Sequence, residues 1–506
     1  MKYTNPIIPG FYPDPSICRA DGRYYLVCSS FQYFPGVPLF ESADLVNWKQ
    51  IGHVLTRKSQ LPLDGAGNAG GIYAPTIRYH EGRFYMVTTN VTGIGNFYVW
   101  TDDIHGEWSD PIAVEQGGID PSLYFENGRA YFMSNGEDDN GEGGITQCEI
   151  DIETGKKLTP SRCIYKGNGG RYLESPHLYK IGNEYYIMAA EGGTEYGHMV
   201  VYAKGPTVNG PFTNYPGNPV LTNRNLGGYE IQGCGHGDIV EDENGNFWMV
   251  HLAFRQIDRW LPFHITGREV YLVPVTFGED GWFRAGVDGI TPKEVETDRI
   301  PEHVVQERKL RESFADTHPG VEWVYLRSPD VSRYQFDSDA QTLKLWDGGL
   351  SLEEREKSPA FLAIRQRQMR GNVRCQVSLP ESAAVGAEAG ISLYMNEEHH
   401  YELAIRRTAA GYEVIKRSAI GYVDCIAEAA SVEEPTAELR IRLDNCEYGF
   451  SCMAGGRETD LGVLMTRYLS SEVACGFTGV MIALYAQGGN GEQPAVFERF
   501  EIRYEL

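Results

Sequence analysis

The chain has 506 residues, with 69 acidic and 45 basic side chains and a formal net charge of -24. This length exceeds the roughly 250–300 residues at which one hydrophobic core stops growing, so we expect two domains. The acidic balance disfavours nucleic acid and acidic membrane surfaces as partners and leaves a neutral ligand open. Hydrophobic residues make up 42% of the chain, which argues for a globular rather than a disordered protein.

The amino terminus, MKYTNPIIPG, lacks the apolar segment of a signal peptide, and no later run of 18 apolar residues follows it. The ten cysteines are scattered, without the close pairs that bind metal ions. These patterns predict a cytoplasmic protein with free thiols and no membrane contact.

A repeat runs through the first three hundred residues. Each copy has a short apolar strand, a turn with one glycine, and a second strand with paired aromatic residues, which is typical of a β-hairpin. The five copies are DPSICRADGRYYLVCSS from Asp14, APTIRYHEGRFYMVTTN from Ala74, DPSLYFENGRAYFMSNG from Asp120, SPHLYKIGNEYYIMAAEG from Ser175 and HGDIVEDENGNFWMVHLAF from His236.

Further strand-like stretches lie between the copies, such as SADLVNWKQIG and TDDIHGEWSDP, which predict an outer hairpin in each unit. Two hairpins give four strands per unit, and a four-stranded unit is the blade of a β-propeller. The sequence therefore predicts an all-β protein whose residues 1–300 form a five-bladed β-propeller.

The repeat ends at the charged stretch TPKEVETDRIPEHVVQERKLRESF, which favours a linker over residues 301–313. Alternating strand patterns follow, among them FLAIRQRQ, NVRCQVSL and FERFEIRYEL. They predict an antiparallel β-sandwich over residues 314–506.

The repeat places acidic residues at equivalent points of different blades. Residues at equivalent positions lie at one height around the propeller axis, where the innermost strands open onto one end of the central channel. We therefore expect Asp14, Asp120 and His236 to converge on one pocket, together with Glu174, which precedes the fourth copy.

Such a cluster suits glycosidic cleavage, in which one carboxylic acid protonates the leaving oxygen and one carboxylate activates water. The apolar neighbours of Glu174 in RYLESPHL favour a raised pKa. His236 lies between glycines that would let the backbone approach a ligand, so it is a candidate for substrate or ion contact. Arg268 could neutralise the carboxylates or bind a sugar hydroxyl. Taken singly, each of these residues also fits a purely structural interpretation.

With these residues the sequence resembles glycoside hydrolase family 43, in particular its β-xylosidases and α-L-arabinofuranosidases with a concanavalin-like carboxy-terminal β-sandwich. The resemblance rests on NPIIPGFYPDPSI, GGIYAPTIRY, GGIDPSLYF, RYLESPHLYK, IQGCGHGDIV and CGFTGVMIALYAQ. It implies an inverting enzyme with Asp14 as general base, Glu174 as general acid, and Asp120 as the residue that orients the acid and tunes its pKa. Inversion requires carboxyl groups roughly 6.5–9.5 Å apart.

The resemblance also implies an exo-acting pocket for a single pentose at the non-reducing end of a small oligosaccharide. Its lining would comprise Phe31, Tyr73, Ala74, Thr194, His236 and Arg268, closed by a sandwich loop near Phe477. Similar xylosidases often have Trp at the position of Tyr73, so the preference between xylose and arabinose stays open. No cofactor is implied for catalysis, calcium is an optional ion near His236, and a homo-oligomer is expected.

Two other interpretations remain open. The same acids in a non-catalytic sugar-binding propeller would only accept hydrogen bonds from hydroxyl groups. A retaining enzyme would use Asp14 as its nucleophile. For the carboxy-terminal domain, a lid over the pocket competes with a carbohydrate-binding or purely stabilising module.

Overall fold

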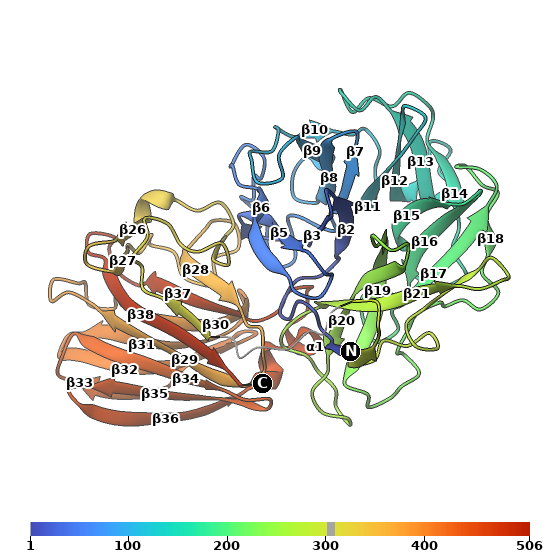
Figure 1. The fold of residues 1–506 in the computed structure, drawn as a ribbon. Helices are drawn as coiled ribbons and strands as arrows, with labels where there is room; N and C mark the ends of the chain where they lie inside the picture. Colours follow the sequence, from blue (N-terminus) through green and yellow to red (C-terminus); the bar gives the residue numbers. More distant parts are fainter. Residues whose placement is uncertain (1, 301–308, 506) are drawn as a thin grey trace.

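The computed structural model describes residues 2–300 and 309–505, and Figure 1 shows a propeller beside a two-layered sandwich. The described elements are strands apart from two short 3-10 helices, η1 (Val331–Arg333) and η2 (Thr466–Leu469), and one short α-helix, α1 (Ser471–Ala474). Helices long and apolar enough to cross a membrane are absent from these residues.

Five four-stranded antiparallel sheets form the propeller, which confirms the predicted number of blades. Blade one has β2 (Ser16–Ala20), β3 (Arg23–Val27), β5 (Gly36–Ser42) and β6 (Lys49–Leu55). Blade two has β7 (Thr76–His80), β8 (Arg83–Asn90), β9 (Gly95–Thr101) and β10 (Ile112–Ala113). Blade three has β11 (Ile119–Glu126), β12 (Arg129–Glu137), β13 (Gly143–Ile150) and β14 (Arg162–Tyr165). Blade four has β15 (Glu174–Ile181), β16 (Glu184–Glu191), β17 (Met199–Gly205) and β18 (Thr213–Asn214). Blade five has β19 (Ile231–Glu241), β20 (Phe247–Arg255), β21 (Glu269–Phe277) and β22 (Phe283–Ala285).

Apolar side chains fill the space between neighbouring blades. Leu39 of blade one packs in one cluster with Met86 of blade two, and Trp248 of blade five packs in another with Leu26 of blade one. A short sheet of β1 (Lys2–Thr4) and β23 (Glu294–Glu296) joins the two ends of this part of the chain. Because each blade buries both faces against its neighbours, the ring holds the start of every innermost strand in place.

Two eight-stranded sheets form the sandwich and enclose its hydrophobic core. One sheet has the order β33-β32-β31-β30-β37-β28-β25-β4, and the other has β26-β27-β38-β29-β34-β35-β36 with β24 beside β38. The bounds are β4 (Tyr33–Phe34), β24 (Lys309–Glu312), β25 (Val324–Leu326), β26 (Tyr334–Asp337), β27 (Thr342–Leu345), β28 (Ala360–Arg365), β29 (Gly371–Ser378), β30 (Glu388–Asn396), β31 (His399–Thr408), β32 (Gly411–Ile420), β33 (Val423–Val432), β34 (Thr436–Leu443), β35 (Glu447–Ala454), β36 (Arg457–Met465), β37 (Met481–Gln487) and β38 (Ala495–Tyr504).

The stretch expected as a linker over 301–313 divides in two. Residues 301–308 lie outside the described residues. Strand β24 pairs along β38, and Leu310 packs against the sandwich core, so the sandwich already includes residues that the charge pattern had assigned to the linker.

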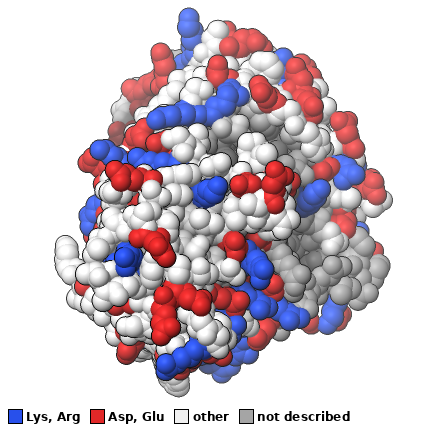
Figure 2. All heavy atoms as spheres, turned by 90° about the vertical axis from the view of Figure 1, so that its left-hand side faces the viewer, with Lys and Arg blue, Asp and Glu red and all other residues white. Residues whose placement is uncertain are grey.

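The propeller and the sandwich share a strand. β4 leaves blade one and pairs with β25 at the edge of a sandwich sheet, with Tyr325 opposite Phe34 and Leu326 opposite Tyr33. Figure 1 shows the two bodies in contact on this side. On the face of the molecule seen in Figure 2, acidic and basic side chains are intermixed, so the described surface there presents no extended field of one sign.

Candidate active site

The pocket is built on the starts of the innermost strands. Four of the five repeat positions have a left-handed backbone, with φ of 55° at Asp14, 53° at Asp120, 57° at Ser175 and 51° at His236, whereas Ala74 does not. The strand register shifts at this point in β11, β15 and β19. Such bulges bend a strand and re-aim its side chains. A non-glycine residue in this region costs on the order of 1–3 kcal/mol and clusters at functional sites.

Asp14 is buried and held by charge-assisted hydrogen bonds. Arg268 Nη1 donates to Asp14 Oδ1 at 2.8 Å, the Ser29 hydroxyl donates to Asp14 Oδ2, and His236 Nδ1 lies 3.6 Å from Oδ1. Burial alone would raise the pKa of Asp14, but the Arg268 charge, His236 and the Ser29 hydrogen bond outweigh it and hold the pKa below its usual value. The carboxylate is therefore ionised at neutral pH.

The pKa values of Glu174 and Asp120 are raised, in contrast to that of Asp14. Burial, followed by the charge of Asp14, raises the pKa of Glu174 to about 7, although Arg268 opposes the shift. Burial raises the pKa of Asp120 well above its usual value, and the charges of Glu174 and Asp14 add to this. The Ser175 N–H donates to Asp120 Oδ2 at 3.2 Å. The cluster thus holds one ionised carboxylate beside carboxyl groups that retain protons near neutrality.

Aromatic rings and Arg268 form the rest of the inner pocket. Phe31 lies 5.4 Å from Tyr73 and 6.0 Å from Phe477 between ring centroids, so a propeller wall meets a sandwich residue here. Arg268 lies over both Phe31 and Phe477, and it also donates to the Thr194 hydroxyl at 2.9 Å and to the Phe477 carbonyl at 3.1 Å. A flat apolar wall beside polar groups suits a sugar ring.

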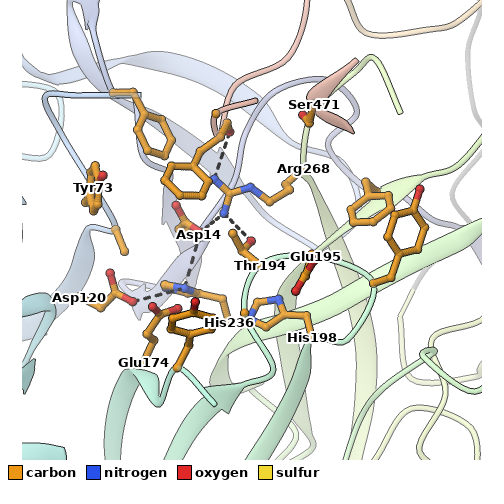
Figure 3. Close-up of a pocket in the computed structure, with 18 of the residues that line it drawn as sticks. Asp14, Tyr73, Asp120, Glu174, Thr194, Glu195, His198, His236, Arg268 and Ser471 are labelled. Atoms are coloured by element: carbon orange, nitrogen blue, oxygen red, sulfur yellow. Dashed lines mark hydrogen bonds and ion pairs between the residues drawn. The ribbon is translucent and has the colours of Figure 1, made fainter. Parts of the chain in front are cut away.

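One cavity of about 690 Å³ contains this arrangement. Figure 3 shows the three carboxylates, His236 and Arg268 directed toward it. The structure brings every predicted site residue into its lining, namely Asp14, Phe31, Tyr73, Ala74, Asp120, Glu174, Thr194, His236, Arg268 and Phe477. The sandwich also contributes Ser471, Glu472, Cys475 and Gly476, as the lid interpretation expects.

The glycines around His236 also have a packing role that the sequence did not indicate. A Cβ on Gly235 would lie 2.3 Å from the His198 ring, and one on Gly237 would lie 2.9 Å from Met249 Sδ. Both glycines therefore accommodate neighbouring protein side chains rather than only a ligand. His198 also lines the pocket, and the sequence analysis did not single it out.

His236 is the residue beside which an optional calcium ion was expected, and that expectation stays a prediction. Calcium takes six to eight oxygen ligands. Within the described residues, groups of three or more His, Cys, Asp or Glu side chains that could hold a metal ion are absent. Burial lowers the pKa of His236, Asp14 opposes this shift and Arg268 adds to it, so the imidazole is neutral, with Nδ1 3.6 Å from Asp14 Oδ1 and 3.9 Å from Asp120 Oδ2.

The sequence analysis missed the outer wall of the pocket. Glu472 of α1 accepts hydrogen bonds from the Tyr196 hydroxyl at 2.8 Å and from the His264 backbone N–H at 3.1 Å, and its Oε1 lies 2.7 Å from His264 Nδ1. Phe254 stacks on His264 with centroids 4.0 Å apart. The Gly-rich stretch EGGTEYGHM after β16 was a usable signal for Tyr196 and His198. Nothing in the sequence pattern marks Glu472.

The channel mouth of this propeller holds an ionised carboxylate and a protonated carboxyl group beside an aromatic wall. This combination is typical of a glycoside hydrolase. Comparison with known proteins supports this class. The sequence model of glycosyl hydrolases family 43 matches residues 3–283, and that of the beta xylosidase C-terminal concanavalin A-like domain matches residues 311–503. The chain belongs to glycoside hydrolase family 43, as the resemblance predicted.

Relatives span nearly the whole chain. The non-reducing end alpha-L-arabinofuranosidase of Bacteroides ovatus is 37% identical over 512 residues, covering 99% of this chain and 94% of the relative. A xylosidase/arabinosidase of Butyrivibrio fibrisolvens is 40% identical and covers 79% of each chain. The solved xylan beta-1,4-xylosidase of Bacillus halodurans superposes with a TM-score of 0.91 at 31% identity, covering 99% of this chain and 100% of that one. Family and relatives together show an exo-glycoside hydrolase.

Proposed function

We propose that the enzyme releases single pentoses, β-D-xylose or α-L-arabinofuranose, from the non-reducing ends of xylo- or arabino-oligosaccharides with inversion of configuration. The names of the relatives support the choice of sugar. The charge states of the carboxylates in the pocket support the mechanism.

Glu174 acts as the general acid and Asp14 as the general base. Glu174 donates its proton to the glycosidic oxygen as the bond to the anomeric carbon breaks. Asp14 accepts a proton from water, whose oxygen bonds to the opposite face of the same carbon. Asp120 orients Glu174 and tunes its pKa as a neighbouring carboxyl group, and the pKa of Asp120 is itself raised by burial and by the charges of Glu174 and Asp14.

The observation that carries this proposal is the separation of the pKa values of two carboxylates in one pocket. Arg268, His236 and Ser29 more than offset the burial of Asp14, whereas burial and Asp14 raise the pKa of Glu174 to about 7. Opposite shifts of this kind assign acid and base roles in glycosidases. A site that only binds sugars would not need them.

The test compares release of xylose and arabinose from oligosaccharides with hydrolysis of the p-nitrophenyl β-D-xylopyranoside and α-L-arabinofuranoside. We expect Glu174→Gln to lower kcat on the oligosaccharides by roughly 10²–10⁴-fold. The loss on aryl glycosides should be smaller, because p-nitrophenol leaves without much help from an acid. Asp14→Asn should lose activity on both kinds of substrate. Glu184→Gln, an exposed residue of the same blade, is the matched control.

Other outcomes distinguish the competing interpretations. Sugar binding by calorimetry without any product would indicate a non-catalytic propeller. NMR of the first-formed anomer identifies the stereochemistry, since a retained anomer would contradict inversion and make Asp14 a nucleophile.

A further inference from the structure

The outer wall of the pocket continues into an exposed loop of the propeller. His264 and Phe254 line the pocket, and His264 directly follows Phe263, which pairs with Ile257 in both directions to close the loop 258–262. Trp260 precedes His264 by four positions in the chain, so their Cα atoms lie at most about 14 Å apart. The loop therefore lies next to the outer wall of the pocket.

Trp260 at the tip of this loop is 91% exposed. Its neighbour Leu261 is also exposed. Among the described residues, Trp260 takes part in no ring stacking and no cation–π contact, whereas most aromatic side chains near the pocket pack against another ring. Because the Trp260 side chain is exposed and has no ring partner, both faces of its indole are available to a ligand. Large apolar rings are usually buried, which makes this exposure notable.

The loop is nevertheless fixed in position. The Trp260 N–H donates to Asp258 Oδ1 at 2.9 Å, and Asp258 pairs with Arg467 of the sandwich at 3.2 Å. Arg467 also donates to the Leu261 carbonyl at 2.8 Å and lies 4.3 Å over the Phe263 ring. Both domains thus anchor the loop while leaving the indole free. Because the backbone that carries the ring is already fixed, a sugar that packs on the indole has to order only the Trp260 side chain.

We propose that Trp260 is a stacking platform for the part of the oligosaccharide that extends out of the pocket beyond the cleaved bond. The proposal rests on the proposed function, because it names the substrate portion that the same site receives. The C–H face of a sugar ring packs on the indole while its hydroxyl groups stay hydrated. Trp260 therefore makes the enzyme prefer longer oligosaccharides over disaccharides and aryl glycosides.

The experiment measures kcat and KM on the aryl pentoside, the disaccharide and longer xylo- or arabino-oligosaccharides for the unmodified enzyme and for Trp260→Ala. We expect KM on the longer substrates to rise roughly five- to thirty-fold with kcat unchanged, because an interaction equal in ground and transition states affects KM alone. KM on the aryl pentoside should stay within two-fold, roughly the resolution of such a comparison. Trp260→Phe should restore most of the loss.

Tyr422→Ala is the matched control, since Tyr422 is fully exposed on a sandwich hairpin between β32 and β33, outside the pocket lining. An equal rise of KM for all substrate lengths, or none for any, would overturn the platform. An unmodified enzyme that hydrolyses none of these glycosides would instead refute the proposed function. Binding of an unrelated protein to the loop, abolished in Trp260→Ala without any change in KM, would also overturn the proposal.

Discussion

Arg268 links the polar and aromatic sides of the pocket. Its guanidinium binds Asp14 and Thr194 while lying over the Phe31 and Phe477 rings. The same charge lowers the pKa of Asp14 and opposes the rise of the pKa of Glu174. One side chain therefore influences both limits of the pH range in which acid and base have their working protonation states.

The pH dependence follows from these two groups. Glu174 must be protonated, so kcat/KM should fall as the pH rises through about 7, the pKa to which burial and Asp14 raise this acid. Asp14 must be ionised, and since its pKa is lowered, activity should persist until the pH falls below the usual range of an aspartate. In Arg268→Gln the pKa of Asp14 should rise by about 1–3 units, and both limits should move to higher pH.

The measurement is a kcat/KM profile between acid and alkaline pH on the aryl pentoside. Arg284→Gln, which removes an exposed arginine of blade five, serves as the control. An acid limit that stays in place in Arg268→Gln would show that Asp14 does not depend on this charge.

Among the elements, the bulges at the starts of β11, β15 and β19 direct side chains of the active site into the pocket. In β19 the register shifts on both sides of Gly235, and His198 occupies the space that a side chain at 235 would need. This packing holds His236 beside Asp14 and Asp120, with Nδ1 3.6 and 3.9 Å from their oxygens.

Gly235→Ala should therefore damage both stability and catalysis. A methyl group in this space forces either β19 or the His198 ring to move, and overpacking of this kind costs about 1–3 kcal/mol. Displacement of His236 should lower kcat as well. Denaturant unfolding and steady-state kinetics check the two effects, with Gly67→Ala as a control because a Cβ there meets open space. Unchanged kcat in a destabilised variant would separate this packing from catalysis.

For the molecule as a whole, the propeller and the sandwich should unfold together. Arg327, fully buried after β25, pairs with Glu397 of the sandwich and donates to the Ala66 carbonyl of the propeller at 2.7 Å. Its backbone N–H donates to the Gln32 carbonyl at 2.7 Å. Arg327 thereby contacts both sides of the boundary.

Arg327→Met should lower the free energy of unfolding by about 3–5 kcal/mol, because it leaves the Glu397 charge buried without its partner. The double variant Arg327→Met, Glu397→Gln should recover part of the loss. Unfolding followed by both tryptophan fluorescence and activity should give one shared transition. Activity that outlasts the first fluorescence change would show that the propeller remains folded without the sandwich.

The sequence predicts those features of this architecture that recur along it. The five hairpins and the positions of Asp14, Asp120 and Glu174 follow from one repeated pattern, so a single alignment of the chain with itself finds them. The bond between Glu472 and His264 joins segments about two hundred residues apart, and no periodic signal marks such a pair. The strand β24 was hidden by its charged residues, and β4 by its two-residue length. The role of Gly235 depends on His198, a neighbour that only the folded chain brings close.

The shared strand β4 has a consequence for how such enzymes diverge. Although two sequence models divide the chain cleanly, residues 33–34 of the first region complete a sheet of the second. A gene fusion that exchanged only the carboxy-terminal half between relatives would place a foreign sandwich edge against this strand. Successful chimeras should therefore carry the segment around Tyr33 along with the sandwich, and the two halves should be inherited as a single unit.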